Sequence, residues 1–237
     1  MEDSDSPPRL SALAHAIGQL GTAPPQPAPQ VDPGRLWTEA LQQSSRLIVW
    51  LAAQVAGIPL NAGLRTRVVA VCFGVAQDHL AGMVTLLASA APNYSSAAAL
   101  LRPQFEAYVR GMWLALLATD VQFERYVDGG ATPNMPAMID AIGKIPDQGS
   151  WPAVRRVYDG MWGELSGFTH TGIAHLKRWS SDGVLQPAYD PLELVGMMDF
   201  ASRIALLSTA GLALMSTVDG LPTRILQEGK ARLPPKR

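Results

Sequence analysis

The chain has 237 residues, of which 48% are hydrophobic and 16% are charged. This balance excludes global disorder, and the length predicts one large domain or two small ones with a sizeable core. The formal net charge of −1 lacks the strongly basic character of a dedicated DNA-binding protein. The single cysteine, Cys72, excludes an intramolecular disulfide and any multi-cysteine metal site.

The first 33 residues differ in composition from the rest of the chain. They hold seven of the 19 prolines, and four acidic residues against Arg9 give them a charge of −3. Such a segment offers little apolar surface to bury, so we predict a flexible, proline-rich N-terminal tail. The N-terminus also lacks a basic start followed by an apolar stretch, so we expect no signal peptide and a cytoplasmic protein.

Helical periodicity dominates the middle of the chain. The predicted helices cover 35–56, 61–90, 93–118, 119–127, 135–142, 151–163 and 191–218. Pro103 interrupts the third segment, so that helix either kinks there or begins its regular part at Pro103. We find no alternating strand and no repeat. The sequence therefore predicts an all-α fold, a bundle of four long helices plus several short ones.

The helical bundle is expected to form a single domain over residues 34–222. The segment after it, residues 223–237, carries five basic residues against Glu228 and is predicted to be a basic C-terminal tail. The most apolar stretches, 47–60 and 204–218, are shorter than the roughly 18–20 residues that span a bilayer, so we expect no membrane segment. Small residues inside the helices indicate close helix packing, within the bundle or across a homodimer.

The first candidate site lies on the third predicted helix. Arg102, Glu106 and Arg110 are four residues apart and share one face of an otherwise apolar helix. Buried charges must be paired, and one carboxylate between two guanidinium groups leaves a positive charge that suits an anion. Two interpretations remain open: a structural ion pair, and an anion or substrate site to which all three residues contribute.

The second candidate site is the segment Thr169-His170-Thr171, which lies between Gly167 and Gly172. It can place an imidazole at the end of an element, and the hydroxyl groups of Thr169 and Thr171 are expected to orient its tautomer and to bind the ligand. His170 is therefore either a structural histidine or a group for proton transfer or ligand contact. We rank it above His175, whose basic neighbours indicate an exposed edge. The spacing of the histidines does not favour a metal site, and no motif predicts a cofactor.

The two candidate sites also carry a resemblance. The strings 102–113 (RPQFEAYVRGMW) and 167–172 (GFTHTG) resemble signatures of an uncharacterised bacterial family of helical proteins, in which an Arg-x-x-x-Glu helix precedes a Thr-His-Thr-Gly element. The resemblance covers residues 35–220 and implies the helical fold and a shared site. It implies no reaction, because that family has no established activity.

A looser similarity links the chain to the HEPN helical ribonucleases, which carry Arg-x4–6-His on a late helix. The only such spacing here runs from Arg9 to His15 in the N-terminal tail, so the catalytic pair of that family is not carried over.

Three functions remain open for this chain. The first is a pocket between the third helix and the Thr-His-Thr segment that binds an anionic ligand, such as a nucleotide, another anionic small molecule or an RNA phosphate. The second is a non-catalytic, dimeric interaction protein whose Arg-Glu stripe is purely structural. The third is a metal-independent phosphodiesterase or ribonuclease with His170 as general base and Arg102 and Arg110 as phosphate ligands. If the two segments form one site, His170 must lie close to the Arg102 face.

Overall fold

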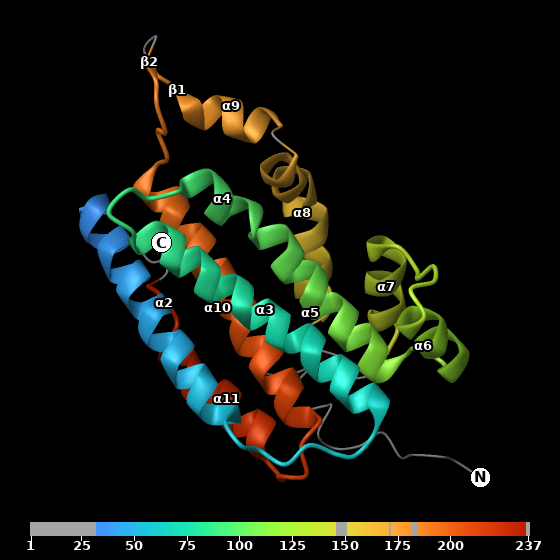
Figure 1. The fold of residues 1–237 in the computed structure, drawn as a ribbon. Helices are drawn as coiled ribbons and strands as arrows, with labels where there is room; N and C mark the ends of the chain where they lie inside the picture. The colour runs from blue at the N-terminus through green and yellow to red at the C-terminus, as the bar shows by residue number, and fades with distance from the viewer. Residues whose placement is uncertain (1–31, 146–150, 171, 182–183, 236–237) are drawn as a thin grey trace.

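The structure is a computed structural model that describes residues 32–145, 151–170, 172–181 and 184–235. Four long helices, α2, α3, α5 and α10, lie side by side and form the body of the molecule (Figure 1). Their bounds are Pro33–Val55, Leu64–Ala88, Leu101–Leu116 and Pro191–Leu214. The predicted all-α bundle is confirmed.

The central helix is α10, which packs against α2, α3, α5 and α11. It begins at Pro191 because the carboxylate of Asp190 accepts hydrogen bonds from the backbone N–H groups of Leu192 and Glu193. Two buried polar contacts join it to its neighbours. The Ser44 and Ser202 hydroxyls lie 3.0 Å apart between α2 and α10. The Gln104 amide on α5 donates to Ala76 O on α3 and Ala201 O on α10.

Pro103 does not kink a long helix but lies in the first turn of α5. A short helix, α4 (Tyr94–Ala99), precedes α5 and is capped by the side chain of Asn93. The two helices meet at Leu100, so Pro103 stands where a missing backbone N–H removes no helical hydrogen bond. Pro103 therefore marks the start of a regular helix, which is the second of the two predicted alternatives.

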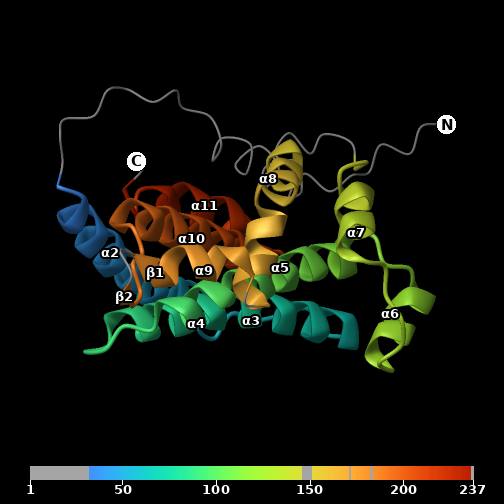
Figure 2. The same cartoon turned by 90° about the horizontal axis from the view of Figure 1, so that it is seen from above.

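The remaining elements lie at the ends and along one side of the body (Figure 2). A capping box formed by Thr119 and Gln122 starts α6, and Asn134 caps α7. A two-residue antiparallel ladder, β1 with β2, follows α9. The bounds are α6 Asp120–Val127, α7 Met135–Ile142, α8 Trp151–Thr169, α9 Ile173–Trp179, β1 Ser180–Ser181, β2 Val184–Leu185 and α11 Leu221–Lys230.

Two predicted boundaries differ most from the structure. The sixth predicted helix was expected to end at Gly163, yet α8 continues to Thr169 because Leu165 and Phe168 are buried against the bundle. The basic segment 223–237 was expected to be a tail, yet α11 includes its first eight residues and buries Ile225 and Leu226. The predicted N-terminal tail falls almost wholly on residues 1–31, which lie outside the described residues.

Two helices, α3 and α10, are long and apolar enough to cross a membrane by length and composition. In the bundle, 72% of the most apolar window of α10 and 39% of that of α3 are buried. A core helix of a water-soluble protein meets the same criteria, so these helices are weak evidence for a membrane span.

Candidate functional site

The structure brings the two predicted segments together between α5 and α8. Arg102 Nε donates to Glu106 Oε1 at 2.8 Å, and Arg102 Nη1 lies 3.3 Å from Ser166 Oγ and 3.0 Å from His170 Nε2. The Arg102 guanidinium also lies over the Trp162 ring, 4.6 Å from its centroid. We call these five residues, Arg102, Glu106, Trp162, Ser166 and His170, the Arg102 cluster.

The hydrogen bond between Arg102 and His170 specifies the state of the imidazole. A guanidinium can only donate, so His170 Nε2 accepts and carries no proton in this arrangement. His170 is exposed, whereas the Arg102 side chain is 23% exposed and that of Glu106 27%. The cluster therefore opens to solvent at its histidine. The predicted proximity of His170 to the Arg102 face is confirmed.

Arg110 does not join the cluster, in contrast to the prediction. Eight residues along a helix correspond to a rotation of about 80°, so Arg102 and Arg110 point in different directions from α5. Arg110 lies near Cys72 and Tyr126. Burial raises the pKa of both of these groups, and the positive charge of Arg110 partly offsets this rise. The buried Arg110 Nε has no hydrogen-bond partner among the described residues.

The predicted threonine ligands are not in the cluster either. Thr169 Oγ1 donates to the carbonyl of Leu165 within α8, so its hydroxyl is used by its own helix. Thr171 lies outside the described residues. Gly172 has a structural role, because a Cβ there would lie 2.9 Å from Gly167 Cα.

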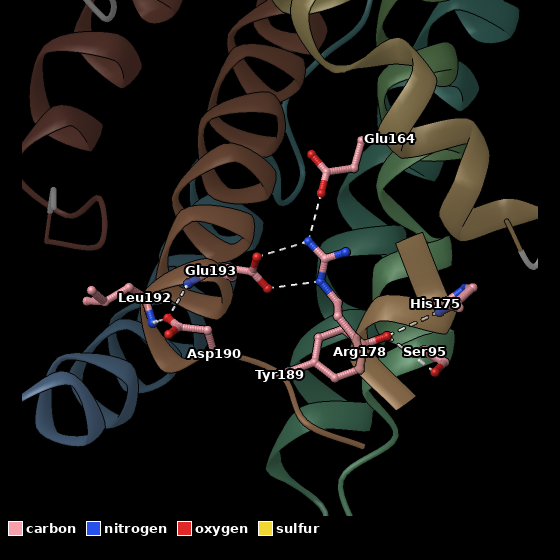
Figure 3. Close-up of polar contacts among 8 residues, drawn as sticks. All are labelled: Ser95, Glu164, His175, Arg178, Tyr189, Asp190, Leu192 and Glu193. Atoms are coloured by element: carbon pink, nitrogen blue, oxygen red, sulfur yellow. Dashed lines mark hydrogen bonds and ion pairs between the residues drawn. The ribbon is translucent and has the colours of Figure 1, made fainter. Parts of the chain in front are cut away.

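A second polar cluster, not predicted from the sequence, surrounds Arg178 on α9. Its guanidinium donates to both carboxylate oxygens of Glu193 on α10, at 2.9 and 3.1 Å, and to one oxygen of Glu164 on α8, at 2.8 Å. Figure 3 shows the guanidinium between these two carboxylates. The Arg178 side chain is only 13% exposed. The ion pairs therefore connect three helices at this end of the bundle.

His175 is buried, and the prediction of an exposed basic edge was wrong. Its Nε2 lies 2.7 Å from the carbonyl of Phe168 and must donate, so Nδ1 accepts from the Tyr189 hydroxyl at 3.2 Å (Figure 3). Burial raises the pKa of Tyr189, which keeps its hydroxyl protonated as a donor. Ser95 lies 3.3 Å from the same hydroxyl. These contacts join α9 to α4 and to the segment before α10.

Two pockets that share lining residues lie next to Arg178, and we call them the outer and the inner compartment. The outer compartment, of about 610 Å³, is lined by charged residues of α8, α9 and the start of α10 together with Gly163 and Gly167. The inner compartment, of about 260 Å³, is lined mainly by apolar residues, including Leu165 and Phe168. Glu164, Arg178 and Glu193 line both compartments, so the two compartments adjoin at these side chains.

The two polar sites lie on different sides of α8. Residues two apart on a helix are rotated by about 200° about its axis. Glu164 therefore lines the cavity while Ser166 faces Arg102 on the other side of α8. The signal for the missed cavity was the spacing of Gly163 and Gly167, four residues apart, which leaves one face of α8 without side chains. No group of three His, Cys, Asp or Glu side chains among the described residues could hold a metal ion.

Comparison with known proteins identifies a family but no activity. Residues 73–231 match the model of DUF6988, described as a family of unknown function, and this span includes both polar sites. No curated protein and no solved structure matches the chain. The resemblance to a helical family without known activity is thus confirmed at this level, and the comparisons show neither HEPN similarity nor a bacterial origin.

Proposed function

For this chain, which belongs to the DUF6988 family of unknown function, we propose that the Arg102 cluster binds a small anionic molecule through a phosphate or carboxylate group. The observation that carries the proposal is the state of the Arg102 guanidinium. Its Nη2 has no hydrogen-bond partner among the described residues, and the side chain is 23% exposed. A planar group with free donors is suited to phosphate and carboxylate oxygens.

The neighbours of Arg102 add further donors for an anion. The Ser166 hydroxyl, within 3.3 Å of Nη1, can donate to a ligand while it accepts from Arg102. Trp162 covers one face of the guanidinium and holds its plane, which leaves the edge for the ligand. A bound anion would therefore contact donors whose positions are already set by α5 and α8.

His170 lies where it can contact an anion that binds to Arg102. In the described arrangement, Arg102 and Glu106 form an ion pair, and His170 Nε2 lies 3.0 Å from Arg102 Nη1. The imidazole stands at the open side of the cluster, so a ligand bound to the guanidinium would also meet this ring.

The expected ligand is a small molecule rather than a nucleic acid. The formal net charge of the chain is −1, whereas binding of a polynucleotide draws on many Lys and Arg contacts to phosphates. The contacts of Arg102 support binding of an anion and imply no catalytic step. A ribonuclease activity is not proposed.

Sulfate is the probe for the test, because its charge is constant near neutral pH while that of phosphate is not. We expect nuclear magnetic resonance titrations of the full chain at pH 7 to show sulfate binding, with shifts at residues 102, 166 and 170. Arg102→Gln should weaken binding by about tenfold or more, since it removes a charge-assisted donor.

The matched control is Arg155→Gln on α8, which also removes an arginine paired with a carboxylate four residues away. It should leave sulfate binding unchanged. The proposal fails if Arg102→Gln binds sulfate as tightly as the wild type, or if the wild type does not bind it. Lower thermal stability of Arg102→Gln without any anion binding by the wild type would assign the cluster a purely structural role.

A further inference from the structure

The two-compartment cavity next to Arg178 is distinct from the Arg102 cluster, and its lining differs in chemistry. We propose that it binds a small organic cation, an ammonium group attached to a compact apolar group. The apolar group occupies the inner compartment and the ammonium lies in the outer one. This inference does not depend on anion binding at the Arg102 cluster, because the two sites lie on different sides of α8.

The inner compartment can accept an apolar group of defined size. Its lining includes Leu101, Met161, Leu165, Phe168 and Met197, and its volume is about 260 Å³. An apolar cavity of about 150 Å³ is large enough to bind benzene, so this space accommodates one aromatic ring or a short alkyl chain. The methionine side chains can adapt to the shape of such a group.

The outer compartment has an excess of negative charge. Three carboxylates line it, those of Glu164, Asp190 and Glu193, against the two cationic side chains of Lys177 and Arg178. One negative charge therefore remains after pairing. A cationic head group balances this charge, whereas an anionic head group would add to it.

Glu164 is the carboxylate best placed to receive the ammonium. It contacts Arg178 through Oε1 alone, its side chain is 47% exposed, and its Oε2 has no partner in the described part of the chain. Glu193 uses both oxygens to bind Arg178, and Asp190 caps α10. Glu164 can therefore bind a second cation without breaking the contact that holds α9 against α10 (Figure 3).

The head group and the apolar group can be tested separately with three probes of one shape. Phenethylamine, phenethyl alcohol and hydrocinnamate carry the same phenyl group with a positive, neutral and negative end. Titration calorimetry of the full chain at pH 7 should give the lowest Kd for phenethylamine, about tenfold below that of the alcohol, and the highest for hydrocinnamate.

Two variants assign the binding to the cavity. Glu164→Gln should remove the preference for the amine over the alcohol, and Met161→Trp should weaken both by filling the inner compartment. The matched control is Glu228→Gln, an exposed carboxylate on α11 remote from the cavity, which should change neither. Circular dichroism and thermal unfolding verify that each variant folds.

Equal affinity for the three probes would overturn the proposed charge preference, and tighter binding of hydrocinnamate would reverse it. The site itself is wrong if no probe binds, or if Glu164→Gln retains the full preference for phenethylamine. Loss of sulfate binding in Arg102→Gln has no bearing on these outcomes, so the two proposals succeed or fail separately.

Discussion

At the scale of single residues, Tyr108 is the most unusual group of the core. Its side chain is fully buried on α5, and its hydroxyl has no hydrogen-bond partner among the described residues. Burial raises the pKa of this phenol well above its ordinary range, because the charged form would be cut off from water. The buried hydroxyl therefore lowers the free energy of unfolding.

The first prediction concerns Tyr108→Phe, which removes this hydroxyl and keeps the ring. The free energy of unfolding at pH 7 should stay the same or rise by about 1 kcal/mol, because a stranded polar group is lost. The pKa of Tyr108 is higher in the folded state than in the unfolded state, so the wild type loses stability as the pH rises past about 10. Tyr108→Phe should lose less stability than the wild type over the same pH range.

Urea unfolding of both proteins between pH 7 and pH 10.5 measures these differences. A loss of more than about 1 kcal/mol at pH 7 would show that the hydroxyl has a partner, for example a buried water.

Other residues show how the same amino acid type acquires different roles. Arg102 and Arg110 lie on one helix, yet Arg102 meets Glu106 and His170 while Arg110 lies near Cys72 and Tyr126. Their four-residue spacing with Glu106 predicted one stripe of charge. The structure divides the stripe, because the neighbouring helices meet different sides of α5.

At the scale of elements, glycines determine how closely α3, α5 and α10 approach one another. The Phe73 ring of α3 is buried next to Gly111 of α5 and Gly211 of α10. A Cβ added at Gly111 would lie 2.8 Å from this ring, and one at Gly211 would lie 2.6 Å from it. The small residues predicted to mark close helix contacts do so here within one chain.

The second prediction is that Gly211→Ala destabilises the protein by about 1–3 kcal/mol, since the methyl group must displace a packed ring or helix. The control is Gly160→Ala on α8, where no atom lies within 4 Å of the added Cβ. It should stabilise the protein by about 0.5–1 kcal/mol through helix propensity. Chemical unfolding of the two variants gives both values, and equal stabilities would contradict the packing described for Phe73.

At the scale of the whole molecule, the two ends of the chain are predicted to contribute unequally to stability. Residues 1–31 combine many prolines with a net negative charge, and we expect their removal to leave the Tm within about 2 °C of the full chain. Removal of residues 221–237 should lower the Tm by about 10 °C or more, because Leu221, Ile225 and Leu226 are buried.

Thermal unfolding of the two truncated proteins tests this third prediction. A decrease of about 10 °C or more after removal of residues 1–31 would show that this segment packs against the bundle or forms part of a subunit interface. Size-exclusion chromatography of the same samples would test the expected homodimer, which stays a prediction, as does the cytoplasmic location.

The sequence by itself determined the elements that depend on local signals. Asp32, Asn93, Thr119 and Asn134 cap helices that begin at or close to their predicted positions, because a cap bonds to backbone groups two or three residues away. The meeting of Arg102 and Glu106 was predictable for the same reason, since four residues on a helix form one turn. Placing His170 beside them required the further argument that a bundle returns the chain to the third helix.

Only the tertiary structure decided the rest. Gly163 resembles a helix end in the sequence, yet α8 continues beyond it to Thr169. The burial of Leu165 and Phe168 stabilises this continuation by more than the low helix propensity of glycine opposes it. In the sequence, Arg178 and His175 resemble an exposed basic edge. In the structure, Glu164 and Glu193 bind Arg178, and Tyr189 binds His175, all from other elements. No local pattern encodes these contacts, because they depend on the angles at which α8, α9 and α10 pack together.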